Sequence, residues 1–158
     1  MVILKKVTAA FCALAIMLPA ATVMAHGKAL TLGKVEDAAL ALGAGARLEP
    51  MKTETATGQI SWLSAVGAGG EKLGFVGVAR ENTDHGYLAQ ATALDMEGKI
   101  VTVIVLRVME DEKRLIGALV RNDGWWRGES GARPEGAALA LLRSVGKVAA
   151  AFPAIKPR

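Results

Sequence analysis

Cysteine and aromatic residues are scarce in this 158-residue chain. It has one cysteine, Cys12, together with three tryptophans, three phenylalanines and one tyrosine. Cys12 lies in an N-terminal stretch with the features of a secretory signal, so the chain that follows this stretch contains no cysteine. For the exported chain this absence excludes disulfide bonds, thiolate metal ligands and cysteine nucleophiles.

An excess of charge of either sign is also missing. Beyond residue 25 the chain carries 17 lysines and arginines against 15 aspartates and glutamates. Proteins that bind nucleic acid through its phosphates usually carry a basic excess, gathered in a patch or stripe. The sequence has no such pattern, and we expect no nucleic-acid partner.

The N-terminus has the three parts of a secretory signal peptide. Lys5 and Lys6 form the positive start, a mainly apolar run spans 7–18, and the small or modest side chains at 23–25 suit a signal peptidase. The run is too short for a comfortable membrane span. We therefore expect a signal peptide over residues 1–25 and a single periplasmic domain over residues 26–158, with no membrane span after cleavage.

Two alternatives concern the same segment. An uncleaved signal would act as a membrane anchor. A lipoprotein would be modified at Cys12, but bulky Phe11 precedes this residue and the apolar run continues past it. We expect Cys12 to leave with the signal.

The first half of the exported chain begins with a helical pattern and continues with strands. Apolar residues recur at helical spacing within 32–44, which predicts a helix capped by Thr31 and ended by Gly43. The stretch 59–66 reads as a strand. A second strand is predicted over 73–80, where two glycines allow a bulge or a close approach, and a polar connection follows it.

The clearest hairpin joins 87–95 to 99–109 through the turn "DMEG". β-branched residues crowd its second arm, and Gly98 can adopt the positive φ that such a turn often needs. The segment 110–120 is interpreted as a short helix or an irregular stretch. Later, Pro134 suits the first position of an amphipathic helix, whose apolar face is formed by Ala137, Leu141 and Val145 and whose end is marked by Pro153.

The order of these elements predicts the fold class. Helix, several strands and helix along one chain indicate a single small α+β domain. We expect an antiparallel sheet, including 73–80, 87–95 and 99–109, to be packed by an N-terminal helix and by a C-terminal helix over 134–152.

The sequence "SGAR" at 130–133, followed by an amphipathic helix, resembles the end of the periplasmic FMN-binding domains. The early helix with its "ARLEP" entry, the strand "LGFVGVA" and the hairpin "ALDMEGKIVTVIVL" are similar to the same family, and the resemblance spans most of residues 30–152. Such domains occur in flavin-carrying subunits of respiratory electron-transfer complexes and in small secreted redox proteins. The resemblance implies flavin-linked electron transfer with a periplasmic redox protein as partner.

The chain departs from this family at two positions of its attachment motif. The family's motif reads Asp, two residues, Ser or Thr, Gly, Ala, then a Thr or Ser that is joined to the phosphate of FMN. Here Arg127 replaces the Asp, Ser130, Gly131 and Ala132 match, and Arg133 replaces the modified hydroxyl residue. A guanidinium forms no phosphoester, so the resemblance implies an FMN held non-covalently, or a site that has lost its cofactor.

The residues around this motif suit a bound flavin. A loop that opens a helix favours a phosphate, because free backbone N–H groups and the helix dipole point at it. Arg127 and Arg133 would add charge-assisted contacts to that phosphate, although a solvated Arg133 is the alternative. Trp125 and Trp126 are candidates to stack on the isoalloxazine, but neighbours on an extended segment face opposite ways, so one of them at most would stack. The alternative for each tryptophan is packing in the core.

A different constellation involves the only two histidines, His26 and His85. If cleavage follows residue 25, His26 offers both its α-amine and a ring nitrogen to one metal ion. A second histidine would complete a histidine brace, whose nitrogen ligands favour copper(II). The alternative interpretation is that His26 falls at the cleavage point by chance and that His85 belongs to an ordinary polar loop.

Other catalytic classes find little support. The acidic residues are scattered, the "EDE" run at 110–112 is typical of a solvated turn, and no Ser–His–Asp arrangement stands out. A third class is a periplasmic binding or assembly module that keeps the fold without a cofactor. Whether the chain is an enzyme is left open by the sequence.

Overall fold

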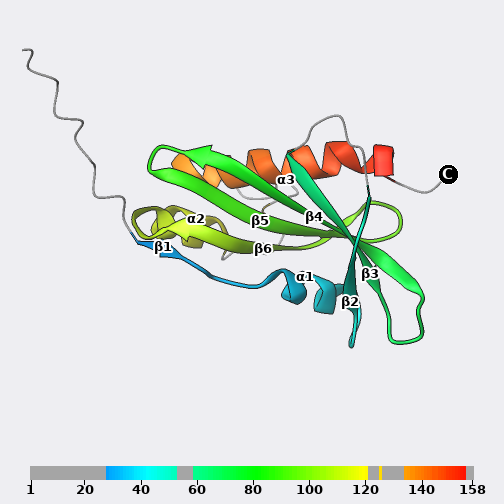
Figure 1. Cartoon of the computed structure of the whole chain (residues 1–158). Coiled ribbons are helices and arrows are strands. Elements are labelled where there is room, and N and C mark those ends of the chain that lie inside the picture. Colours follow the sequence, from blue (N-terminus) through cyan, green and yellow to red (C-terminus); the bar gives the residue numbers. More distant parts are fainter. Residues whose placement is uncertain (1–27, 53–58, 121–124, 126–133, 156–158) are drawn as a thin grey trace, which may run out of the picture.

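The computed structural model of the chain describes residues 28–52, 59–120, 125 and 134–155. These residues form one α+β domain, as predicted (Figure 1). In chain order the elements are β1 (Ala29–Leu30), α1 (Val35–Leu42), β2 (Arg47–Pro50), β3 (Ile60–Val66), β4 (Lys72–Thr83), β5 (Gly86–Leu94), β6 (Ile100–Met109), the 3₁₀ turn η1 (Glu110–Glu112), α2 (Lys113–Val120) and α3 (Gly136–Ile155).

The strands form one antiparallel, six-stranded sheet in the order β1-β6-β5-β4-β3-β2. Strands β2 to β6 follow one another as a meander, and the short β1 pairs with the outer edge of β6. This topology needs only short connections between the long strands, because antiparallel neighbours can be joined by tight turns. The predicted strand pairing of 87–95 with 99–109 is confirmed.

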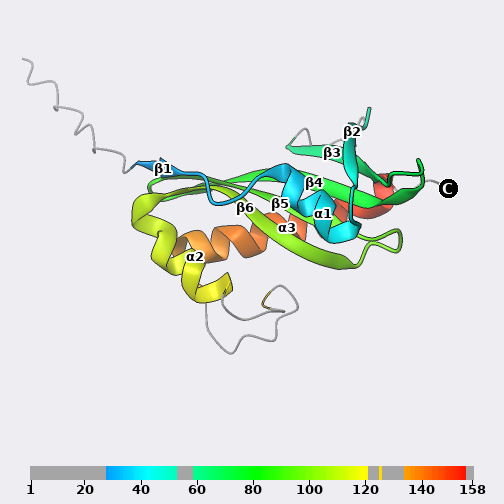
Figure 2. The same cartoon turned by 90° about the horizontal axis from the view of Figure 1, so that it is seen from below.

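The sheet has a helix on each face. Figures 1 and 2 show α3 along one face and α1 against the opposite face. On the α3 side, Phe75 of β4 meets Phe152 of α3 edge to face, with ring centroids 5.5 Å apart. On the α1 side, buried Ala38 packs against Val76, Ala91 and other small side chains of the sheet. The predicted packing by an N-terminal and a C-terminal helix is therefore confirmed.

The apolar character of α3 is explained by its place in the core. By length and composition this helix is apolar enough to cross a membrane. In the structure, its predicted apolar face, formed by Ala137, Leu141 and Val145, is buried against the sheet and α2. A helix that covers a sheet face needs such an apolar stripe.

Three glycines have the roles that the sequence predicts: two allow a close approach of other atoms, and one has a positive φ in a turn. A Cβ added at Gly74 would lie 2.2 Å from the carbonyl oxygen of Leu94, and one at Gly77 would lie 2.4 Å from Cγ1 of Val148 on α3. Gly98 has a φ of 88° in the turn between β5 and β6. In the same turn, the Asp95 side chain accepts hydrogen bonds from the backbone N–H groups of residues 97 and 99.

Several predicted boundaries are wrong. The residue before the first helical turn is Lys34 rather than Thr31, and its N–H donates to Asp37 Oδ2. The helix α3 begins at Gly136, two residues after Pro134. It also continues through Pro153, because this proline falls in the last turn and its neighbour Phe152 is buried in the core.

The connection after β4 is also tighter than the predicted polar loop. Thr83 pairs directly with Gly86, so only Asp84 and His85 form the turn. Two-residue turns of this kind are the commonest connections in antiparallel hairpins, and they match the twist of the strands. As a result, His85 lies at the exposed tip of a long hairpin.

Candidate functional site

Trp125 is a core residue in the structure. Its side chain is 1% exposed and belongs to a cluster that we call the α2–α3 core. This core is formed by Leu88, Val105, Val108, Ile116, Leu119, Trp125, Ala137, Ala138, Leu141 and Val145. Since a stacking platform must expose one ring face, the burial of Trp125 favours the core interpretation of this residue and leaves Trp126 as the candidate for stacking.

The other flavin-site candidates lie outside the described residues. These are Trp126, Arg127, Ser130, Gly131, Ala132 and Arg133. The two flanks of their segment are described, since Trp125 precedes it and Pro134 follows it. Trp125 and Ala137 both belong to the α2–α3 core. The described residues on either side of this segment in the sequence are thus anchored in the same core cluster.

The start of α3 has an unusual backbone. Gly136 has a φ of 51°, a left-handed conformation that glycine adopts without strain. The carbonyl of Glu135 accepts hydrogen bonds from the N–H groups of Ala138 and Leu139. The N–H of Ala138 in the first turn is therefore already bonded, and an anion at this helix start would have to use the N–H groups that precede it.

A large hollow lies along the exposed side of α2. Its volume is about 1060 Å³, and its described lining is Asp111, Lys113, Arg114, Leu115, Gly117 and Ala118. A Cβ added at Gly136 would lie 3.0 Å from Cδ1 of Leu115, so this hollow borders the start of α3. Two cations, one carboxylate and an exposed leucine, 42% accessible, therefore line a hollow beside the start of α3, the helix that follows "SGAR" in the sequence.

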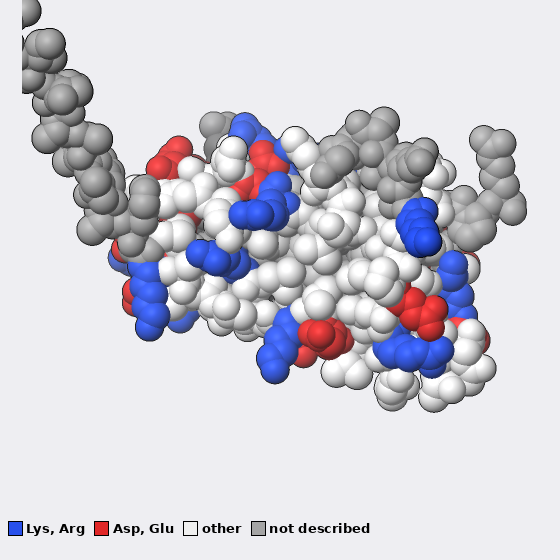
Figure 3. All heavy atoms as spheres, viewed as in Figure 1, with Lys and Arg blue, Asp and Glu red and all other residues white. Residues whose placement is uncertain are grey.

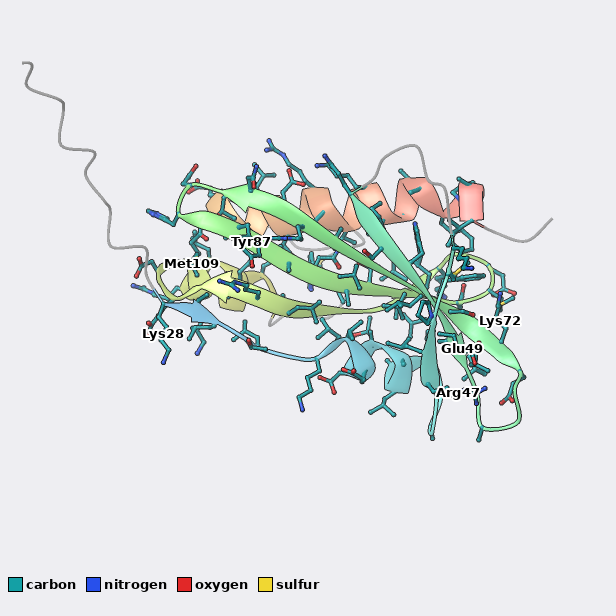
Figure 4. All side chains as sticks on the ribbon, viewed as in Figure 1. Lys28, Arg47, Glu49, Lys72, Tyr87 and Met109 are labelled. Atoms are coloured by element: carbon teal, nitrogen blue, oxygen red, sulfur yellow. The ribbon has the colours of Figure 1, made fainter. Side chains whose placement is uncertain are left out.

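The predicted copper site involves the end of the sheet that carries His85. Figure 4 shows Lys28, Tyr87 and Met109 at this end. Ala29 pairs with Met109, and the carbonyl of Lys28 accepts a hydrogen bond from the N–H of Glu110 at 2.9 Å. A Cβ added at Gly86 would in turn lie 3.3 Å from Sδ of Met109. The strand β1 thus begins at the same end of the sheet as the turn that holds His85.

The copper constellation itself stays a prediction. His26 lies outside the described residues, and His85 is exposed at the tip of its hairpin. Within the part of the chain that the structure describes, no group of three or more His, Cys, Asp or Glu side chains is placed to hold a metal ion. A brace formed by His26 and His85 uses fewer such side chains, so this observation does not bear on it.

The structure adds a cluster that sequence reasoning missed. The Tyr87 ring on β5 has Arg80 of β4 and Arg107 of β6 over it, with guanidinium carbons 3.9 Å and 4.7 Å from the ring centroid. Cation–π contacts of this geometry hold both side chains on the surface of the sheet. The two-residue turn at 84–85 sets the strand register that places Arg80 diagonally across from Tyr87, and the sequence alone did not reveal this register.

A second missed contact holds the hairpin tip. Glu112 in η1 is 2% exposed, and one of its oxygens accepts a hydrogen bond from Thr83 Oγ1 at 2.8 Å. The predicted solvated turn at 110–112 is therefore wrong for its last residue, which is buried. This bond ties the end of β4 to the start of α2.

Charge on the surface is mixed. On the face shown in Figure 3, lysines and arginines are interspersed with aspartates and glutamates. This agrees with the balanced composition. Comparison with known proteins gives no further assignment: no family model matches the chain, and neither the curated proteins nor the solved structures contain a match.

Proposed function

We propose that the exported protein binds FMN non-covalently and serves in flavin-linked electron transfer in the periplasm. The observation that carries this proposal is the hollow of about 1060 Å³ along α2, which borders the start of α3 at Gly136. Its size lies just above the usual range for small-molecule sites, about 300–1000 Å³, so it has room for a ligand as large as FMN. In the sequence, "SGAR" directly precedes Pro134, two residues before this helix start.

The described lining suits the parts of a flavin mononucleotide. Leu115, Gly117 and Ala118 offer apolar surface with little side-chain bulk to a flat ring system, and Lys113 and Arg114 offer positive charge to a phosphate. When bound, FMN would supply the electron-accepting ring that amino-acid side chains lack. The chain's own part is to hold the phosphate and to shield one side of the ring.

Individual roles follow from the chemistry of the side chains. Ser130 and the backbone N–H groups of Gly131 and Ala132 would donate to phosphate oxygens beside the helix start. Arg133 and Arg127 would add charge-assisted hydrogen bonds. Trp126 is assigned to the ring, since Trp125 is buried in the α2–α3 core.

The test is a titration of the mature protein with FMN, followed by flavin and tryptophan fluorescence. A charge-assisted hydrogen bond contributes about 1.5–3 kcal/mol, so Arg133→Ala should weaken binding roughly ten- to hundredfold. Arg143→Ala is the matched control, because Arg143 is an exposed arginine of α3 that does not line the hollow. Absence of saturable quenching at high micromolar FMN, in a folded protein, would refute the proposal and favour a binding or assembly module without cofactor.

A copper-binding function is the second candidate, and one observation favours it. The strand β1 starts beside Met109, at the end of the sheet where the turn Asp84–His85 lies. His26 precedes Ala29 by three positions, and an extended chain of that length spans about 10 Å. With cleavage after residue 25, His26 would start within reach of His85.

This candidate has its own test. Intact-mass measurement of protein from its native host should give residues 26–158, and the mature protein should bind one Cu(II). Both His85→Ala and a chain with one extra residue before His26 should lose that binding, the second because its α-amine is displaced. Equal Cu(II) binding by the mature protein and both variants would eliminate the brace.

A further inference from the structure

Two adjoining hollows lie beside the last residues of β4, where this strand extends beyond its partner β3. Neither hollow is lined by a described residue of α2. The strand β3 pairs with β4 only as far as Ile60 opposite Ala79, whereas β4 continues to Thr83. One hollow, of about 330 Å³, lies between this edge and α3, and the other, of about 410 Å³, extends along the edge itself. Both are lined by Gln59, Arg80 and Lys147, so they share one mouth.

The smaller hollow has apolar walls made of small side chains. Beyond the shared residues, its lining is Ile60, Ala79, Ala150 and Ala151. Its small side chains are buried Ala79 of β4, partly buried Ala151 of α3 and exposed Ala150 at the rim. Methyl groups offer no hydrogen bonds to water, so displacing water from such walls with an apolar group is favourable.

The larger hollow is polar and carries the charges. Ser61, Glu81 and Asn82 complete its lining, and Lys147 Nζ forms an ion pair with Glu81. Arg80 is turned toward the neighbouring strand, since its guanidinium carbon lies over the Tyr87 ring. Among the described residues of the lining, Lys147 is therefore the cation of the shared mouth that a ligand can engage, and these residues carry one more positive than negative charge, with Arg80 and Lys147 against Glu81.

We propose that this pair of hollows is a second ligand site, which binds a small amphipathic anion with an apolar body and one carboxylate. The body would lie among the alanines of the smaller hollow, and the carboxylate would bind Lys147 in competition with Glu81. A volume of 330 Å³ holds on the order of ten groups the size of a water molecule or a methylene. A medium-chain fatty acid of about ten carbons fits this size.

The site is independent of the proposed flavin site. It uses β3, the end of β4 and the second half of α3, whereas the "SGAR" segment precedes the first turn of that helix. Loss of decanoate binding would leave FMN binding unchanged, and the reverse also holds.

The probe is decanoate, titrated below its aggregation concentration and followed by calorimetry. Ala150→Leu should reduce affinity more than tenfold, because the larger side chain occupies the apolar hollow. Ala154→Leu is the matched control, since Ala154 is exposed on α3 one turn further along and does not line either hollow. This variant should bind like the original protein.

Substitutions at the two partners of the ion pair, Lys147 and Glu81, should change the affinity for decanoate in opposite directions. Lys147→Gln removes the cation and should weaken decanoate roughly three- to fivefold, whereas Glu81→Gln removes the competing carboxylate and should strengthen it by a similar factor. Decanol, which lacks the charge, should bind without either effect. The proposal is overturned if decanoate shows no saturable binding, if Ala150→Leu binds it as well as Ala154→Leu does, or if the two charge variants change affinity in the same direction.

Discussion

The side chain of Gln90 on β5 donates a hydrogen bond to Ser144 Oγ on α3, over 3.1 Å. Both residues have no exposed surface, although the interface around them is apolar. Thr92 Oγ1 donates in turn to Gln90 Oε1 at 2.6 Å. Because a buried polar group is costly when its partner is lost, this chain of two bonds specifies how α3 sits on the sheet.

Removing the helix side of this network should destabilise the protein. Ser144→Ala leaves an amide donor of Gln90 buried without its acceptor, and we expect a loss of about 1–3 kcal/mol in the free energy of unfolding. Urea denaturation measures it, with Thr31→Ala as an exposed control. Replacing all three members of the network, in Gln90→Leu with Ser144→Ala and Thr92→Val, should recover part of the loss, because no buried polar group is then left without its partner. A single variant as stable as the original would contradict the role of the bond.

Two glycines should respond to alanine in opposite ways. At Gly77 the new methyl group would meet Val148 Cγ1 at 2.4 Å, and overpacking of this kind costs about 1–3 kcal/mol. At Gly117, in the middle of α2, nothing lies within 4 Å of the added Cβ, so the better helix propensity of alanine should stabilise by about 0.5–1 kcal/mol. Thermal melts of both variants check the pair. A stabilising Gly77→Ala would mean that α3 does not lie against β4 there.

Loss of the hydrogen bond between Thr83 and Glu112 should destabilise the protein, because this bond holds the hairpin tip against η1. Thr83→Val keeps the side-chain shape but removes the donor to a carboxylate that is 2% exposed. We expect a loss of about 1–3 kcal/mol at neutral pH. A double-mutant cycle with Glu112→Gln separates this bond from other effects of each substitution. A coupling energy near zero would show that the two side chains act independently.

The sequence predicted the parts of the fold that have a strong local signal. The "DMEG" turn, the β-branched arm of β6 and the apolar face of α3 each repeat a pattern over several residues, so their type and partners could be inferred. The two-residue β1 and the four-residue β2 carry too short a pattern for this. Their pairing depends on the tertiary fold, because each adds to the edge of a sheet that other residues form.

Contacts between side chains on neighbouring strands could not be predicted from the sequence for a different reason. The Arg80–Tyr87 contact and the hollow beside Lys147 depend on strand register, and a one-residue slip would turn every side chain to the other face. The long hairpin turned out to have a two-residue turn, whereas the polar sequence around it predicted a longer loop. For the flavin motif, the sequence supplied the candidate residues, and the structure supplied the position of both flanks.

The two adjacent tryptophans allow a final prediction, because Trp125 is buried in the structure and the proposed function assigns Trp126 to the flavin ring. Trp125 is buried in the α2–α3 core, so Trp125→Phe should destabilise the protein by about 1–3 kcal/mol, through lost packing, while FMN affinity changes less than threefold. Trp126→Phe should leave stability within about 0.5 kcal/mol, and it should weaken FMN and reduce flavin quenching. Acrylamide quenching gives an independent measure: in Trp126→Phe the two tryptophans left, Trp62 and Trp125, are 2% and 1% exposed and should resist the quencher until the protein unfolds. The assignment is wrong if Trp125→Phe is the variant that loses FMN at unchanged stability, since the ring of Trp125 would then face the ligand rather than the core.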